Sequence, residues 1–109
     1  METDYGHPDL TRAEVDGRSG PLILEFGANW CGICRAARPA IAAALEAAPV
    51  PHLRIEDGPG RRLGRSFAVK LWPTLIFLRD GREIERLVRP AGPEALVAAL
   101  ERLQAKLEG

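Results

Sequence analysis

The chain has 109 residues, with 15 Lys and Arg against 15 Asp and Glu, 46% hydrophobic residues and two cysteines. This length suffices for one soluble domain with a core that needs neither metal nor several disulfides, and it argues against a second domain. The zero formal net charge argues against bulk electrostatic binding of nucleic acid or of an anionic membrane. Residues 1–7 lack a signal-peptide pattern and no apolar run could span a bilayer, so the chain is expected in the cytoplasm.

The first twenty residues are polar and contain several glycines, which favours a loose N-terminal arm (1–20) ahead of a domain over residues 21–109. Within this arm, Thr11 and Glu14 have the spacing of a capping box, which indicates one short helix. The apolar run at residues 21–26 is bounded by glycines and predicts a central strand covered on both faces.

Apolar residues then recur at helical spacing from Cys34 to Ala48, with Pro39 expected to kink this helix near its first turns. Two prolines end the helix, and residues 52–56 alternate as a second strand would. A short, weak helix is expected over residues 60–68, and a third strand over residues 74–78.

The dipeptide Asp80-Gly81 is the strongest hairpin signal in the chain and predicts antiparallel pairing of the third strand with residues 83–88. A final helix begins at Gly92-Pro93, and its apolar stripe consists of Leu96, Leu100, Leu103 and Leu107. The resulting order, β-α-β-α-β-β-α, predicts an α/β fold. Its sheet is expected to contain parallel strands with helices on both faces and an antiparallel hairpin at one edge.

Cys31 and Cys34 lie between a predicted strand and a predicted helix, the setting in which a Cys-x-x-Cys pair becomes reactive. The N–H groups and the positive dipole end at a helix N-terminus stabilise a thiolate, so Cys31 is the expected nucleophile. Cys34 lies one turn further on the apolar stripe and is expected to be less exposed. It is placed to resolve a mixed disulfide formed on Cys31.

Four features coincide between residue 21 and residue 107, and together they resemble the thioredoxin family. They are the hairpin with its C-terminal helix, and three groups of residues: Trp30-Cys31-Gly32-x-Cys34, Pro39, and Trp72-Pro73-Thr74 before a strand. The resemblance implies a thioredoxin fold, with a central mixed sheet of four to five strands flanked by helices. It also implies that Pro73 is cis and faces the cysteine pair.

The resemblance further implies a thiol–disulfide oxidoreductase, a protein-disulfide reductase that exchanges its redox-active dithiol with target proteins. Its partners would be disulfide-containing proteins and a flavoprotein or glutathione-linked electron donor, with no bound cofactor. A monomer active in electron transport and cell redox homeostasis is expected. The implied substrate-binding residues are Trp30, Gly32, Ile33, Trp72, Pro73, Thr74 and Arg89.

Glu25 is the only charged residue in the run 21–26 and matches the buried acid of thioredoxins. Burial would favour its protonated form and make it a proton acceptor or relay, through water, for Cys34. The alternative is a carboxylate that reaches solvent, or one that pairs with His52 or Arg54.

Three residues depart from the usual thioredoxin pattern. Ile33 stands where thioredoxins usually have proline, and it restores a backbone N–H and frees φ. This difference suggests a weaker reductant than a housekeeping thioredoxin. Arg89 stands where glycine is common, and Trp72 replaces a smaller aliphatic residue, so both suggest a narrowed range of partners.

Other chemistries fit the cysteine pair less well. Neither His7 in the polar arm nor His52 has the spacing of a zinc ligand relative to the cysteines, so no metal site is expected. Two alternatives stay open. One is a non-catalytic thioredoxin-fold module that docks a partner around Trp30, Trp72 and Pro73, and the other is an exported disulfide oxidase or isomerase.

Overall fold

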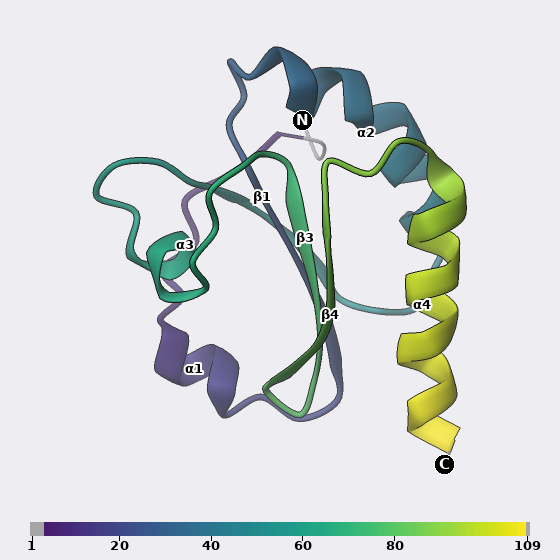
Figure 1. Cartoon of the computed structure of the whole chain (residues 1–109). Coiled ribbons are helices and arrows are strands. Elements are labelled where there is room, and N and C mark those ends of the chain that lie inside the picture. Colours follow the sequence, from purple (N-terminus) through teal and green to yellow (C-terminus); the bar gives the residue numbers. More distant parts are fainter. Residues whose placement is uncertain (1–3, 109) are drawn as a thin grey trace.

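The computed structural model describes residues 4–108, and the side chains of residues 4–105. Four strands form one sheet, and four helices lie on its two sides (Figure 1). In chain order the elements are α1 (Arg12–Asp16), β1 (Pro21–Gly27), α2 (Gly32–Leu45), β2 (His52–Glu56), α3 (Arg62–Ser66), β3 (Thr74–Arg79), β4 (Arg82–Val88) and α4 (Pro93–Glu108). The predicted order of elements is confirmed, with α1 where the capping box places it.

The strands lie in the order β2-β1-β3-β4, so β1 is an interior strand, as its glycine-bounded apolar run predicts. β1 pairs parallel with β2 but antiparallel with β3, and β3 pairs antiparallel with β4. The sheet is therefore mixed, and β1 with β2 is its single parallel pair among the described residues. The connection 57–73, which contains α3, explains this arrangement. It returns to its starting point, where the Trp72 indole donates to Asp57 at 2.9 Å, so β3 begins at the end of the sheet where β2 ends.

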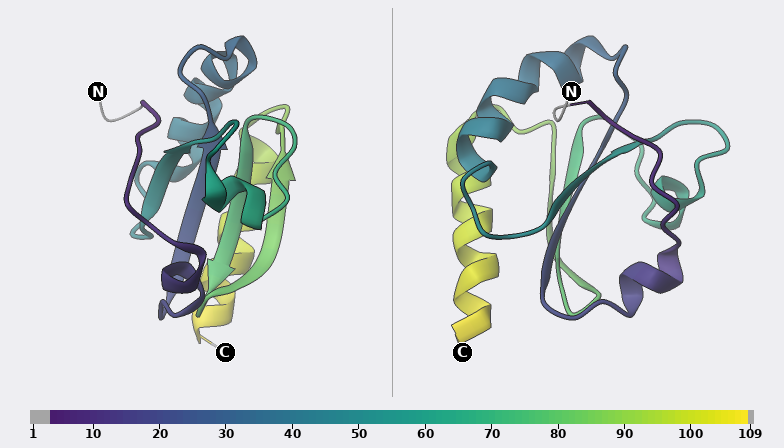
Figure 2. Two further views of the ribbon diagram at one scale, coloured as in Figure 1. Left: turned by 90° about the vertical axis from the view of Figure 1, so that its left-hand side faces the viewer. Right: turned by 180° about the vertical axis from the view of Figure 1, so that it is seen from behind.

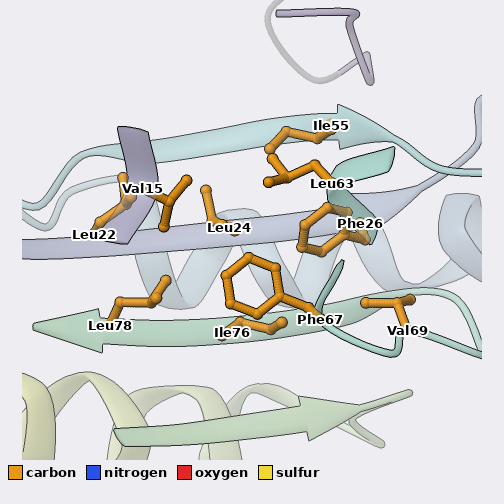
Figure 3. Close-up of a cluster of buried hydrophobic side chains, with 10 residues drawn as sticks. All are labelled: Val15, Leu22, Leu24, Phe26, Ile55, Leu63, Phe67, Val69, Ile76 and Leu78. Carbon is orange, nitrogen blue, oxygen red and sulfur yellow. The ribbon is translucent and has the colours of Figure 1, made fainter. Parts of the chain in front are cut away.

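The two faces of β1 bury two different sets of side chains. Even-numbered positions face α1 and α3, whereas Ile23 faces α2 and α4. Figure 3 shows the first cluster, which consists of Val15, Leu22, Leu24, Phe26, Ile55, Leu63, Phe67, Val69, Ile76 and Leu78. In the second cluster, Leu96, Leu100 and Leu103 of the predicted stripe pack against α2, whereas the side chain of Leu107 lies outside the described residues.

α2 begins and ends earlier than its apolar stripe predicts. The Cys31 Sγ accepts a hydrogen bond from the Cys34 N–H at 3.2 Å and acts as the N-cap, so the helix begins at Gly32 rather than at Cys34. It continues through Pro39 and ends at Leu45. The prolines that follow disfavour helical backbone in the residues before them, which shortens the predicted C-terminal end.

The predicted hairpin is present, and Asp80 and Gly81 have φ values of +53° and +80°. The Asp80 Oδ1 accepts from the Gly20 N–H at 2.8 Å, which ties the turn to the start of β1. A Cβ at Gly81 would lie 2.0 Å from the backbone oxygen of Asp16. Glycine is thus required there both by the backbone conformation and by the contact with α1.

The segment before β1 is not the loose arm that its polar composition suggested. Tyr5 is only 3% exposed, and Val15 of α1 belongs to the core. Gly6 forms a parallel bridge with Ile55, so this segment runs alongside β2, the outer strand on that side of the sheet (Figure 2). Two isolated apolar side chains anchor the segment, and neither belongs to a periodic pattern that a sequence would display.

Candidate active site

The cysteine pair lies where β1 leads into α2, with Cys31 as the N-cap and Cys34 in the first turn. Both thiols are free. Cys31 keeps 8% of its surface exposed, whereas Cys34 is completely buried, so the second sulfur is the less accessible one, as predicted. A target could therefore reach Cys31 without reaching Cys34.

The surroundings of the two sulfurs separate their pKa values. Burial acts to raise the pKa of Cys31, but hydrogen bonds from Cys34 and from the Ile33 N–H, with the charge of Arg89, outweigh it and lower that pKa. Burial, followed by the hydrogen bond and charge of Cys31, raises the pKa of Cys34 to about 11. The more exposed sulfur is thus also the one that ionises more readily.

Two tryptophans lie beside the pair. Trp30 is 72% exposed, and its ring meets the Trp72 ring edge to face at a centroid distance of 5.5 Å. Trp72 also packs against the cluster that contains both cysteines. The Trp72–Pro73 peptide bond is cis, as the resemblance implied, and the buried Thr74 donates from its hydroxyl to the Leu71 carbonyl at 2.6 Å.

Arg89 has a positive φ of +51° and reaches this same loop. Its Nε donates to the Trp72 carbonyl at 2.9 Å, and its backbone N–H donates to the Pro73 carbonyl at 2.9 Å. Ile33 and Arg89 line one shallow pocket of about 210 Å³ next to α2, and Gly32 is exposed. The structure therefore places Ile33 and Arg89 in one pocket and ties Arg89 to the loop of Trp72, which packs against the cysteine cluster.

Glu25 is completely buried in β1. Its carboxylate accepts a hydrogen bond from the Tyr5 hydroxyl, lies 2.9 Å from His52 Nε2 and lies 3.6 Å from Arg54 Nε. Of the two alternatives raised for this residue, the structure has the pairing with His52 and Arg54 and no exposure to solvent. Glu25 faces the cysteines through Tyr5, a partner that the sequence did not indicate.

Tyr5 is a residue of this site that sequence reasoning missed. Its hydroxyl donates to the Glu25 carboxylate, and its ring belongs to the same buried cluster as the two cysteines. Burial, followed by the charge of Glu25, raises the pKa of Tyr5 above its ordinary value. No sequence signal could have found it, because the residue is an isolated aromatic in a polar segment.

Asp57 is the second missed residue. It follows β2 directly and is buried, and its carboxylate accepts from Trp72 Nε1 at 2.9 Å and from Arg65 at 2.6 Å. A Cβ at Gly64 would lie 2.0 Å from the Asp57 carboxylate, so glycine leaves the room for it. Asp57 holds the tryptophan that precedes the cis proline. In the sequence it is one acid in a loop rich in glycine.

Two further observations concern the described residues as a whole. No group of three or more His, Cys, Asp or Glu side chains within residues 4–105 is arranged to hold a metal ion. In the part of the chain that the structure describes, no helix has the length and the apolar character needed to cross a membrane.

The chain was compared with known families, with curated proteins and with solved structures. A family model described as thioredoxin matches residues 9–102. The thioredoxin of Chlamydia trachomatis is 33% identical over 89 residues, which cover 79% of this chain and 85% of that protein. The thioredoxin of Mycobacterium tuberculosis is 30% identical over 89 residues, with coverage of 80% and 77%.

Solved structures show the same likeness. The reduced form of thioredoxin 2 from Pseudomonas aeruginosa PAO1 superposes with a TM-score of 0.85 and is 52% identical, covering 97% of this chain and 99% of that one. A thioredoxin mutant from Halobacterium salinarum has a TM-score of 0.73 at 22% identity and shares the fold. Together with the cysteine pair at the start of α2 and the cis proline that follows Trp72, these matches show that the chain belongs to the thioredoxin family, whose chemistry is that of thiol–disulfide oxidoreductases.

Proposed function

We propose that this protein is a protein-disulfide reductase that exchanges the Cys31 and Cys34 dithiol with disulfides of target proteins. The observation that carries the proposal is the difference between the two sulfurs. Cys31 is the N-cap of α2, is 8% exposed and has a lowered pKa, whereas Cys34 is completely buried and has a raised pKa. A nucleophile and a resolving thiol need this division of exposure and acidity.

The reaction transfers two electrons to the target in two displacement steps. The Cys31 thiolate attacks one sulfur of the target disulfide, and the other target sulfur leaves as a thiolate. Cys34 then loses its proton and attacks the Cys31 Sγ, so that a disulfide joins Cys31 to Cys34 and the second target sulfur leaves as a thiolate. The target thiolates take protons from solvent. Glu25 accepts the Cys34 proton, since it is the carboxylate that faces that thiol through Tyr5.

The surface around Cys31 suits an extended segment of a target protein. Trp30 and Ile33 are exposed apolar side chains, and the backbone of Trp72 next to cis Pro73 offers hydrogen bonds to such a segment. The Trp72 carbonyl already accepts from Arg89, but a carbonyl oxygen has a second lone pair for the N–H of a target. Gly32 has no side chain to obstruct the approach to the Cys31 sulfur. The Thr74 hydroxyl fixes the loop before β3 through its hydrogen bond to the Leu71 carbonyl.

An external donor must return two electrons to the oxidised pair. We assign this role to a flavoprotein or a glutathione-linked protein. In this proposal the protein acts as a monomer in the cytoplasm, without a bound cofactor. Ile33 leads us to expect a potential less negative than the roughly −270 mV of thioredoxin. Equilibration with glutathione measures it, and a value at or below that figure contradicts the expectation.

Reduction of insulin by dithiothreitol tests the central proposal. The wild type is expected to accelerate it, and Cys31→Ser is expected to remove the acceleration completely. Cys34→Ser is the matched variant, because it keeps the nucleophile and should trap targets as mixed disulfides with Cys31. An unchanged rate in Cys31→Ser would refute the assignment and favour a binding module that tolerates the loss of both sulfurs.

A further inference from the structure

Next to the buried Cys34, the Tyr5 ring fills the space that a side chain at position 27 would need. Gly27, in β1, has no side chain where the strand faces α2, and the Tyr5 ring occupies the space instead. A Cβ built on Gly27 would lie 2.5 Å from the Tyr5 Cζ, 2.7 Å from the Tyr5 hydroxyl oxygen and 2.9 Å from the Cys34 Sγ. The tyrosine hydroxyl and the resolving sulfur are thus both within 3 Å of one point inside the domain.

Hydrogen bonds fix Tyr5 in this position from both ends. The Tyr5 N–H donates to the Asn29 Oδ1 at 2.8 Å, and the Asn29 Nδ2 donates to the Tyr5 carbonyl at 3.1 Å. The Arg38 guanidinium lies 5.7 Å from the centroid of the tyrosine ring. At the other end, the hydroxyl donates to the Glu25 carboxylate, which also faces His52 and Arg54.

In the resolving step Cys34 must give up its proton, and Tyr5 and Glu25 are arranged to take it. Burial is the largest cause of the raised pKa of Cys34, and it persists when Cys31 is bound in the mixed disulfide, so Cys34 must lose its proton as it attacks. The nearby Tyr5 hydroxyl acts against the dominant effect of burial and lowers the pKa of Cys34. The pKa of Tyr5 itself is raised, so the hydroxyl can release its proton only while it receives another.

We propose that the Tyr5 hydroxyl carries the Cys34 proton to Glu25 during attack on the mixed disulfide. As the Cys34 sulfur bonds to the Cys31 Sγ and the target thiolate leaves, the Cys34 proton moves to the Tyr5 oxygen and the Tyr5 proton moves to the Glu25 carboxylate. Tyr5 is neutral before and after the step, and Glu25 ends protonated. This relay rests on the proposed function, because it serves the second displacement of that reaction.

Ellman's reagent separates the two displacements in a stopped-flow experiment. Attack by Cys31 releases the first equivalent of coloured thiolate, and attack by Cys34 releases the second. In Tyr5→Phe, which removes one oxygen atom and keeps the ring, the first phase is expected within twofold of wild type. The second phase is expected to slow about 10-fold at pH 7, the effect of a one-unit rise in the pKa of Cys34. A second phase within twofold of wild type overturns the relay.

Two further single variants and one double variant test whether the slower second phase comes from the loss of the proton path. Arg38→Gln removes the guanidinium near the tyrosine ring and its hydrogen bond to the Asn29 Oδ1 but keeps the Tyr5 hydroxyl, and both of its phases are expected to match wild type. Glu25→Gln is expected to slow the second phase as Tyr5→Phe does. The double variant Tyr5→Phe, Glu25→Gln should be no slower than the slower single variant, because both residues act on one proton path. If the double variant slows the second phase by the product of the two single effects, the two residues do not share one proton path.

The wild-type protein supplies a measurement that does not depend on any variant folding. If two protons move in the resolving step, the rate of the second phase falls as a curved function of the deuterium fraction of the solvent. A linear dependence means that one proton moves and overturns the relay. Failure of the proposed function has a different signature, in which the wild type releases both equivalents from Ellman's reagent but does not accelerate insulin reduction.

Discussion

Replacement of Gly27 with alanine would place a methyl group in the space that Tyr5 fills. The added carbon would lie 2.5 Å from the Tyr5 Cζ and 2.9 Å from the Cys34 Sγ, whereas carbon contacts are comfortable at roughly 3.5 to 4.0 Å. The strand backbone is interior to the sheet and cannot retreat easily. The tyrosine ring must therefore move by about 1 Å, away from Glu25 as well as from the strand.

Two effects set the size of the loss of stability. Overpacking of a core costs about 1 to 3 kcal/mol, and loss of a hydrogen bond to a charged group costs about 1.5 to 3 kcal/mol. We expect the free energy of unfolding to fall by about 3 kcal/mol, near the lower end of the combined range, because the ring can tilt rather than leave. For a domain of this length, that loss lowers Tm by about 15 °C.

Urea unfolding, followed by circular dichroism, measures the loss. Gly32→Ala is the matched control, since it adds the same methyl group five residues beyond the end of β1, at a site where no atom outside the adjoining backbone lies within 4 Å. It is expected to stay within about 1 kcal/mol of wild type. Gly27→Ala should cost clearly less in a Tyr5→Ala background, where the clash with the ring is gone and only the 2.9 Å approach to the Cys34 Sγ is left. A Gly27→Ala variant as stable as Gly32→Ala would refute the close contact.

Three other results are expected. At pH 7, iodoacetamide should alkylate Cys31 and spare Cys34. The lowered pKa of Cys31 leaves more of it as reactive thiolate at a given pH, and the raised pKa of Cys34 leaves less. Cys34 should react only as the pH approaches about 11. Equal labelling of the two sulfurs at pH 7, measured by mass spectrometry, contradicts this order. Arg89→Gly should slow the first phase with Ellman's reagent, because the charge that helps to lower the pKa of Cys31 is lost, but it should not destabilise the fold, since glycine tolerates the φ of +51°. A faster first phase or a lower urea midpoint counts against this. Asp57→Ala should cost about 2 kcal/mol in urea unfolding, because the partly buried Trp72 N–H loses its charged acceptor, and a loss below about 0.5 kcal/mol would show that Asp57 does not hold Trp72.

The parts of the fold that the sequence predicted well are those determined by neighbours in the chain. Asp80-Gly81 forms its hairpin because both residues accept the positive φ values that a tight turn needs. The run at residues 21–26 has too many apolar side chains for an exposed strand, so its interior position follows from composition alone. The lower exposure of Cys34 likewise follows from its place on the apolar stripe of α2.

The sequence could not predict contacts in which distant segments supply one another's side chains. Gly27 was predicted only as a boundary of the first strand, and Tyr5 lay in a segment expected to be a loose arm, although the two residues pack against each other. Asp57 gave no signal because its role depends on the return of the loop that carries Trp72. The roles of the groove residues around Cys31 also remain predictions, since the structure places them close together but contains no target.

Because Tyr5 packs directly against Gly27, a substitution at either position during evolution depends on the residue at the other. A larger residue at position 27 would meet the tyrosine ring, and a smaller residue at position 5 would leave a cavity behind the cysteines. Either change made first passes through a less stable protein, even if the pair of changes is harmless. A marginally stable domain has little room for such an intermediate. Lineages that carry this pair are therefore expected to keep both residues or to exchange both, and to keep or lose the proton path through the hydroxyl with them.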